Sequence, residues 1–542
     1  MLGRDAFDED RLGAFEQKGV IQDSIHGFIP INRAEYWLLQ TPFLRRLHGI
    51  KQLGMAFLVF PSARHSRLEH SLGVMHLATL IAMRVVQVAR RDPKVRDAIF
   101  QTDKPSAVNS FVQVARLTGL LHDLGHLAYS HMTEEAVTSL AMYSEEGKGS
   151  AELFKELSGL GHGKIKVHEA YTQAFIDGLV KLASEAPAEA AVDTIQPFLT
   201  LVKSTLAKDL EGRQDTPRSA LEELGLREGA LSVIRDIISN EIADADRLDY
   251  LQRDAQATGI VYGNIDADRL VSGITVNVIN DEPVLSLDIK SLQTLEDVFD
   301  ARYKMYRSVY FHHKVIALTK AVTYFMRSLA FEWRSDAIPL YEGLSLYEVL
   351  SPSRLTNAIL EDRYYFDDAE LDNVVRFYAA RGKLSRRWAL SLLDRRDLLP
   401  ISIVKRSEEL IIMAEDVLRS ANVPVNPDNV SKLLVYAVSR LNQINDKVKK
   451  RLSVDVKLDD FKENVINPQK LYSGGLRVFG WEQSLYLRSL AEEGKIPVVL
   501  LYAYADDDKV HVDWVRKRAE ELRELTKAEL RDVMMEGLDE LR

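Results

Sequence analysis

Apolar residues recur at three- and four-residue spacing along most of the chain, which is the pattern of helices that bury one face. The clearest examples are the segments SLGVMHLATLIAMRVVQVARR, NSFVQVARLTGLLHDL and KLLVYAVSRLNQINDKVKKRL. Runs in which apolar and polar residues alternate are few. We therefore predict a mainly α fold in which small β-hairpins interrupt a helical framework.

Three segments have the alternating or continuous apolar pattern of strands. GVIQDSIHGFIPIN and GITVNVINDEPVLSLDI each predict a β-hairpin, and in the second the residues Asn280-Asp281-Glu282-Pro283 supply the turn. KIPVVLLYAYADDD predicts a buried strand framed by charged helices. The segment GKGSAELFKELSGLGHGK is rich in glycine and predicts a mobile surface loop.

The sequence contains few signals of domain boundaries. The segment RSANVPVNPDNVSK contains two prolines and predicts a break near residue 425. We expect a main helical domain over residues 1–335, a helical extension over 336–425, and a smaller mixed α/β domain over 426–542. The last of these is expected to have a regulatory or oligomerising role.

Composition limits the chemistry that the chain can perform. The 542 residues are 46% hydrophobic and 28% charged, which is typical of a soluble globular protein. Cysteine is absent, so any metal must be bound by imidazole and carboxylate groups. The net charge of −10 argues against a wholly basic nucleic-acid-binding protein. The charged amino terminus lacks an apolar leader, and we expect a cytoplasmic protein with no membrane partner.

A histidine cluster is the strongest chemical signal. The segment LTGLLHDLGHLAYSHMTEEA contains His122, His126 and His131. A helix that ends at LLHDLGH would place His122 and Asp123 at its polar exit, and Gly125 would let the chain turn. A lone His-Asp pair is more often a helix cap or a surface pair. A metal site therefore requires further ligands, for which His70 in HSRLEHSLG and Asp246 in DADRLDYLQRD are the candidates.

The order of these segments carries a family resemblance. HSRLEHSLG, HDLGHLAYSHM, VHE and DADRLDYLQRDA resemble, in sequence, the H…HD…D signature of the HD-domain phosphohydrolases. IHGFIPI, TPFLRRLHGIKQLG and FPSARHSRLEHSLGV are more closely similar to the subfamily that hydrolyses deoxynucleoside triphosphates (dNTPs). The similarity extends from about Gly19 to about Lys314. It implies an HD-type helical domain followed by a smaller α/β region.

The resemblance assigns roles to two groups of residues. The metal ligands that it implies are His70, His122, Asp123 and Asp246. His131 falls on the position that protonates the leaving oxygen, and His126 lies beside it. Glu134 takes the place of an aspartate that supports this acid, and His168 in VHE falls on another active-site histidine.

The resemblance also implies a substrate site. Its phosphate-binding residues would be Arg67 and Arg302, together with His313, which stands where the family has a lysine, and the adjacent Lys314. Its sugar contacts would be Gln52, Tyr250, Asp254 and Tyr310. A tyrosine against the ribose edge would exclude a 2′-hydroxyl; the alternative for Tyr250 is an ordinary core aromatic.

Family members with a guanine-nucleotide activator carry an aspartate, a glutamine and an arginine before the IKQLG segment. The aligned residues here are Gln40, Arg45 and His48, so we do not expect an activator site of that design. Regulation by a different nucleotide effector is the alternative.

The function implied is a metal-dependent dNTP triphosphohydrolase that converts a dNTP and water into a deoxynucleoside and triphosphate. The cofactor would be a divalent ion (Mn, Fe, Zn, Ni or Mg), with additional Mg on the substrate phosphates. Assembly as a homodimer or homotetramer is expected. The alternatives are an HD-type phosphodiesterase, nuclease or phosphatase acting on another nucleotide or on single-stranded nucleic acid, and a non-catalytic nucleotide sensor.

Overall fold

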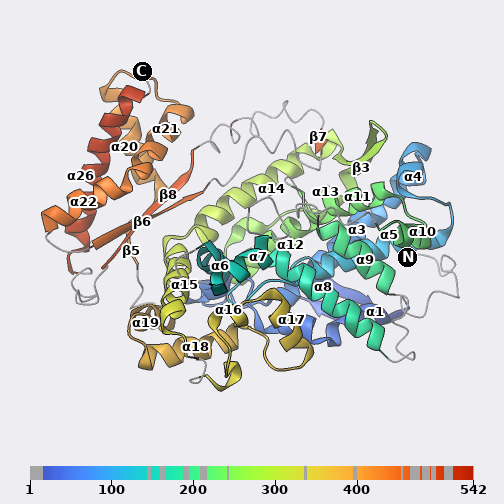
Figure 1. Cartoon of the computed structure of the whole chain (residues 1–542). Coiled ribbons are helices and arrows are strands. Elements are labelled where there is room, and N and C mark those ends of the chain that lie inside the picture. Colours follow the sequence, from blue (N-terminus) through green and yellow to red (C-terminus); the bar gives the residue numbers. More distant parts are fainter. Residues whose placement is uncertain are drawn as a thin grey trace. The chain divides into compact units, whose positions relative to one another are not determined.

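The computed structural model of the chain describes residues 16–542 apart from 143–147, 159–166, 187–194, 208–216, 241–242, 335–337, 395–399, 453–455, 464–476, 479–488, 490–495, 506–516 and 541–542. The described residues form two compact units (Figure 1). The first unit comprises 1–302, 329–374 and 473–481, and the second comprises 303–328, 375–472 and 482–542. The three-part division expected from the sequence stays a prediction.

Helices dominate both units, which confirms the mainly α fold expected from the apolar periodicity. The helices that lie wholly or mainly in the first unit are α1 (Arg33–Gln40), α2 (Pro42–Arg45), α3 (Arg67–Ala89), α4 (Pro93–Ile99), α5 (Pro105–Leu121), α6 (His131–Met142), α7 (Lys148–Ser158), α8 (Val167–Glu185), α9 (Gln196–Leu206), α10 (Arg218–Leu224), α11 (Glu228–Ile238), α12 (Ala245–Thr258), α13 (Ala267–Gly273), α14 (Leu292–Met305), α16 (Leu346–Val349) and α17 (Pro352–Leu360), while α18 (Asp368–Arg381) is divided between the units.

Both predicted hairpins are present in the first unit. β1 (Gln17–Asp23) pairs antiparallel with β2 (Gly27–Asn32), and β3 (Ile274–Ile279) pairs antiparallel with β4 (Glu282–Leu287). Asn280 and Asp281 join the latter pair with φ of 53° and 64°, which is the backbone of a type I′ turn. A third short strand, β7 (Arg477–Val478), runs parallel to β4.

Helix α3 is the central helix of the first unit and packs against α5 and α12. Ser66 and Glu69 form a capping box that fixes where it begins. By length and composition alone α3 could cross a membrane, and it is the single helix of the described residues with this property. Most of its apolar stretch is buried inside the protein, as in a core helix.

The predicted surface loop over residues 147–164 is wrong over much of its length, because residues 148–158 form α7. Leu153 and Leu157 are four residues apart, so they lie on one face of this helix, and both are buried. This apolar pair outweighs the glycines that suggested a loop. The remainder of the segment lies outside the described residues.

The second unit is built on one antiparallel sheet with the strand order β5-β8-β6. Its strands are β5 (Ile401–Val404), β6 (Val456–Glu463) and β8 (Val498–Ala505). Its helices are α15 (His313–Glu332), α19 (Arg386–Leu393), α20 (Ser407–Ser420), α21 (Pro427–Ser439), α22 (Leu441–Leu452) and α26 (Ala519–Gly537), with the end of α15 in the first unit. The segment near residue 425 lies between α20 and α21, which both belong to the second unit, so the domain boundary expected there stays a prediction.

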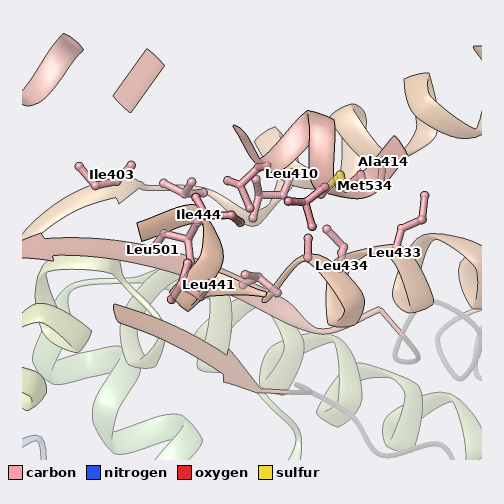
Figure 2. Close-up of a cluster of buried hydrophobic side chains, with 14 of the residues drawn as sticks. Ile403, Leu410, Ala414, Leu433, Leu434, Leu441, Ile444, Leu501 and Met534 are labelled. Atoms are coloured by element: carbon pink, nitrogen blue, oxygen red, sulfur yellow. The ribbon is translucent and has the colours of Figure 1, made fainter. Parts of the chain in front are cut away.

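Strand β8 is buried on both faces, which confirms the buried strand predicted from its continuous apolar run. Leu501 and Ala503 face a core formed with α20, α21, α22 and α26 (Figure 2). Leu500 and Tyr502, which alternate with them, contact Ile316 of α15. The hydroxyl of Tyr502 is satisfied because it donates to the carbonyl of His313 at 3.0 Å.

We predict that Leu410→Ala lowers the free energy of unfolding of the second unit by about 2–5 kcal/mol, because Leu410 is buried in the core shown in Figure 2. Ile412→Ala on the same helix is the matched control. Its side chain is 58% exposed, so we expect a change below about 0.5 kcal/mol. Chemical denaturation of the two variants measures both effects, and equal losses would contradict this account of the core.

Candidate active site

The loop between α5 and α6 carries the histidine cluster, and buried groups hold its backbone. Helix α5 ends at Leu121, and His122 is its C-terminal cap, as the sequence predicted. The Arg46 guanidinium donates to the carbonyl of Leu124 at 3.2 Å and to that of His126 at 2.5 Å. Since Arg46 is itself buried, these hydrogen bonds fix the path of the loop.

The last turn of this loop adopts a strained backbone. Tyr129 and Ser130 have φ of 59° and 56°, a region that residues other than glycine rarely adopt. The amide of Tyr129 donates to Asp368 at 2.8 Å, and Lys51 pairs with the same carboxylate at 2.9 Å. These contacts keep the strained turn in place, and helix α6 begins directly after it, at His131.

Gly125 has a different role from the one expected. It is not among the residues with positive φ, so the turn does not depend on its conformational freedom. A side chain at this position would instead overlap the carbonyl of His168 and the backbone of Thr172 on α8. The Gly125 amide donates to Thr172 Oγ1 at 3.0 Å. Glycine is therefore required for α8 to approach the loop and bring His168 beside the cluster.

The structure brings together the four residues expected to bind a metal. His70 Nε2 lies 3.0 Å from Asp246 Oδ1 and 3.6 Å from Asp123 Oδ2. His122 Nε2 lies 3.2 Å from Asp123 Oδ1 and 3.8 Å from Asp246 Oδ1. The four side chains come from α3, the end of α5 and α12, and we call them the metal quartet.

The geometry of the metal quartet fits a divalent cation. Nε2 of His70 and Nε2 of His122 are buried, and neither makes a hydrogen bond to any described residue. Their Nδ1 atoms are engaged instead, His70 with Asp249 Oδ2 at 2.8 Å and His122 with the carbonyl of Gly119 at 2.8 Å. An Nδ1–H donor leaves the Nε2 lone pair for a metal, so both rings are oriented as ligands. Imidazole with carboxylate suits first-row divalent metals.

Charge at the metal quartet also favours a cation. Burial by itself would lower the pKa of His70, but the carboxylates of Asp246 and Asp249 outweigh it and raise the pKa to about 10. Burial would raise the pKa of Asp246, whereas His122 and His70 hold it below its usual value. This excess of carboxylate charge attracts a proton or a metal ion, which compete for the same nitrogen atoms.

A second group of side chains surrounds Glu134. Its Oε2 lies 3.2 Å from His131 Nδ1 and 3.1 Å from His168 Nδ1, and its Oε1 is hydrogen-bonded to His126 Nδ1. The rings of His126 and His168 stack with centroids 4.6 Å apart. We call these four residues the Glu134 cluster. His126 Nε2 is 3.2 Å from Asp123 Oδ1, so one imidazole bridges the cluster and the metal quartet.

The environment separates the proton affinities within the Glu134 cluster. Burial would lower the pKa of His168, but the negative charge of Glu134 raises it to about 9. Burial and the nearby Arg67 lower the pKa of His126 to about 4. The His131 side chain is 70% exposed, whereas His126 is buried. A protonated and a neutral imidazole thus share one carboxylate, an arrangement suited to proton transfer.

The residues expected to bind phosphate and sugar lie in different surroundings. Arg67 is buried and pairs with Asp123, and its Nε donates to Ser130 at 3.0 Å. Gln52 is also buried, and its Oε1 makes no hydrogen bond to a described residue.

Tyr250 is half-buried and Asp254 buried, one turn apart on α12. Arg302 lies on the α14 part of the first unit, whereas the second unit contains Tyr310, His313 and Lys314.

Two residues beside this site were missed by the sequence analysis. Asp249 contacts His70, and His65 Nε2 lies 2.8 Å from Asp254 Oδ1. Asp249 follows Asp246 by three residues, a spacing that places both on one face of α12 and could have indicated a shared role. His65 stands two residues before Arg67, outside any helical spacing to the ligands. Only the fold shows that it reaches Asp254.

Comparison with known proteins connects this site to a family. Residues 67–180 match the family model described as HD domain. An uncharacterized protein of Methanocaldococcus jannaschii, MJ1154, is 30% identical over 55% of this chain and 46% of its own length. Human deoxynucleoside triphosphate triphosphohydrolase SAMHD1 is 30% identical over 55% of this chain and 42% of its own. The chain spans about half the length of the curated relatives that it matches.

Solved structures show the same fold at lower identity. A phosphohydrolase from Bacteroides thetaiotaomicron matches 90% of this chain and 99% of its own with a TM-score of 0.56 and 20% identity. A hypothetical protein from Aquifex aeolicus matches 93% of this chain and 99% of its own with a TM-score of 0.54 and 21% identity. Together, these comparisons show that residues 67–180 match an HD domain and that the chain shares the fold of the two solved structures.

Proposed function

We propose that this protein is a metal-dependent dNTP triphosphohydrolase. The observation that carries the proposal is the contact between the metal quartet and the Glu134 cluster through His126. A site that holds a cation beside protonatable imidazoles can both activate a water molecule and supply a proton. The relationship to SAMHD1, whose name states this reaction, supports the choice of substrate class.

The reaction requires an activated water, neutralisation of the phosphate charge and a proton for the leaving oxygen. Water attacks the α-phosphorus, the bond from this phosphorus to the sugar 5′-oxygen breaks, and triphosphate and a deoxynucleoside are released. A divalent cation bound by the metal quartet would supply Lewis acidity and an activated water, with a pKa lowered from ~15.7 to as little as about 7 in the case of zinc. Arg67 is buried against Asp123, and its guanidinium would neutralise phosphate charge.

The departing 5′-oxygen requires a proton, and the Glu134 cluster can deliver it. His131 is exposed, and Glu134 holds its Nδ1, so the remainder of the ring faces solvent and an incoming substrate. His168 shares the same carboxylate oxygen and can restore the proton. Glutamate in place of the family's aspartate has a longer arm, which in this structure reaches three imidazoles.

Sugar selectivity would come from α12. Asp254 is held by His65 at 2.8 Å, and this contact would orient its carboxylate for a sugar hydroxyl. Tyr250 lies one turn earlier on the same helix and would pack against the ribose edge. A ring in that position excludes a 2′-hydroxyl by shape, which favours deoxynucleotides over ribonucleotides.

Further expectations belong to this proposal. We infer that the protein is cytoplasmic, assembles as a homodimer or homotetramer, and responds to a nucleotide effector. Size-exclusion chromatography with light scattering, in the presence and absence of dNTPs, measures the last two.

The decisive experiment supplies each dNTP to purified protein loaded with Mn, Fe, Zn, Ni or Mg, with and without candidate activators, and identifies the products. We expect inorganic triphosphate and a deoxynucleoside. Asp246→Asn should reduce kcat/KM by a factor of about 100 or more, because it removes a charged ligand of the cation. Asp268→Asn, in the equivalent first turn of α13, is the control and should retain activity.

Release of only phosphate or pyrophosphate, or activity confined to single-stranded DNA or cyclic nucleotides, would contradict the proposal. The latter result would instead assign the site to another HD-type phosphodiesterase.

Glu134→Gln should move the alkaline limb of the kcat/KM profile to lower pH. In the native protein His168 keeps its proton until the pH rises through about 9, because Glu134 stabilises the charged ring. Without that negative charge the pKa of His168 falls, and the proton is lost about 1–3 pH units earlier. Glu169→Gln is the control, since the charge of Glu169 acts on His168 more weakly and should shift the limb less. An unchanged limb in Glu134→Gln would exclude His168 as a proton carrier.

Tyr250→Ala should reduce the preference for dATP over ATP by a factor of about 10 or more, since removing the ring admits a 2′-hydroxyl. Tyr250→Phe keeps the ring and should keep the preference. The measurement is the ratio of kcat/KM for the two nucleotides. If both variants discriminate like the native protein, Tyr250 is an ordinary packing residue.

A further inference from the structure

Asp249 is a buried carboxylate with a full set of hydrogen-bond donors. Its Oδ2 accepts from His70 Nδ1 at 2.8 Å and from Arg253 Nε at 2.8 Å. Its Oδ1 contacts His26 Nε2 at 2.7 Å and accepts from Arg253 Nη2 at 2.8 Å. The four contacts use the acceptor capacity of the carboxylate, so the side chain has one available orientation.

The chain of contacts continues to the first hairpin. Arg253 Nη1 and Nη2 donate to Asp23 at 2.9 and 3.2 Å, and Asp23 Oδ1 accepts from the amides of Ile25 and His26 at 2.9 and 2.8 Å. Asp23, Asp249 and Arg253 are all buried. The end of β1 is thus connected to His70 through two carboxylates and one guanidinium.

Helix α3 leaves room for this arrangement at Gly73. A side chain at position 73 would overlap Asp249 Oδ1 and lie 2.5 Å from Arg253 Nη2. Gly73 is one turn after His70 on the same helix, so glycine opens the face of α3 across which Asp249 reaches the imidazole. Glycine destabilises a helix interior by about 1 kcal/mol relative to alanine. Leaving room for Asp249 at position 73 therefore lowers the stability of α3.

We propose that Asp249 is a positioning residue that fixes the tautomer and orientation of His70 for metal binding. This inference rests on the proposed function, because it takes the metal quartet to be a cation site. A neutral imidazole carries one N–H, and the bond to Asp249 keeps that hydrogen on Nδ1. Nε2 then presents its lone pair toward Asp123 and Asp246. Arg253 and His26 hold Asp249 so that it cannot rotate away.

The experiment separates this role from ordinary structural support. Glu35 is also fully buried and also accepts a bidentate arginine pair, from Arg116 Nε and Nη2 at 2.6 and 2.8 Å, but it contacts none of the metal quartet. Asp249→Asn and Glu35→Gln therefore remove comparable buried charges. Both should lower the melting temperature of the full-length protein, and only the first should affect the metal.

The readout is Co²⁺ and Mn²⁺ binding to the metal-free full-length chain, measured by calorimetry, with the Co²⁺ visible absorption spectrum as a second measurement. We expect Asp249→Asn to bind either ion about 10- to 100-fold more weakly and to change the Co²⁺ spectrum. The asparagine NH₂ would face donors, which favours the wrong tautomer of His70. Glu35→Gln should bind like the native protein.

Gly73→Ala keeps every hydrogen-bonding group and adds helix propensity, so it tests the inference if Asp249→Asn fails to fold. Its methyl group displaces the Asp249 side chain, and we expect the same loss of metal affinity. Native metal affinity in a folded Asp249→Asn or Gly73→Ala variant would overturn the positioning role while leaving the proposed function intact. A native protein that binds neither ion would overturn both.

Discussion

Buried charge is the constraint on which the rest of this site depends. An ionised side chain removed from water is stable only with a partner and a full set of hydrogen bonds. Asp249 meets this condition with four donors, and Arg253 and Asp23 extend it to the first hairpin. The Nε2 atoms of His70 and His122 are among the buried polar atoms of the described residues that make no hydrogen bond, and both lie close to carboxylate oxygens. A cation bound between these side chains would satisfy both nitrogen atoms.

The two functional groups are coupled because they share neighbours. Asp123 belongs to the metal quartet, yet it contacts His126 and Arg67 as well. Arg67 and Glu134 act on His126 with opposite sign, and burial decides the outcome by lowering its pKa to about 4. His168, stacked on the same ring, has its pKa raised to about 9. Neighbouring imidazoles with such different proton affinities are what a directed proton transfer requires.

Motif order and apolar periodicity predicted the helical framework, both hairpins, the buried strand β8 and the residues that converge at the site. They did not predict Asp249, His65 or Arg46, because each acts across a long sequence separation that only the fold closes. They also misjudged α7, where two buried leucines outweigh flanking glycines, and Gly125, whose role is close packing against α8. Local sequence patterns identify the side chains that carry the chemistry. The contacts that hold those side chains in place are tertiary and appear only in the folded chain.

The discontinuity of the first unit has a consequence for how the chain becomes active during synthesis. Asp368 holds the amide of Tyr129 and the ammonium of Lys51, yet it emerges from the ribosome more than two hundred residues after Tyr129. A nascent chain that stops near residue 335 would contain every member of the metal quartet and still lack the clamp on the strained turn before α6. The contacts that hold this turn can therefore form only after the segment that carries Asp368 has been synthesised.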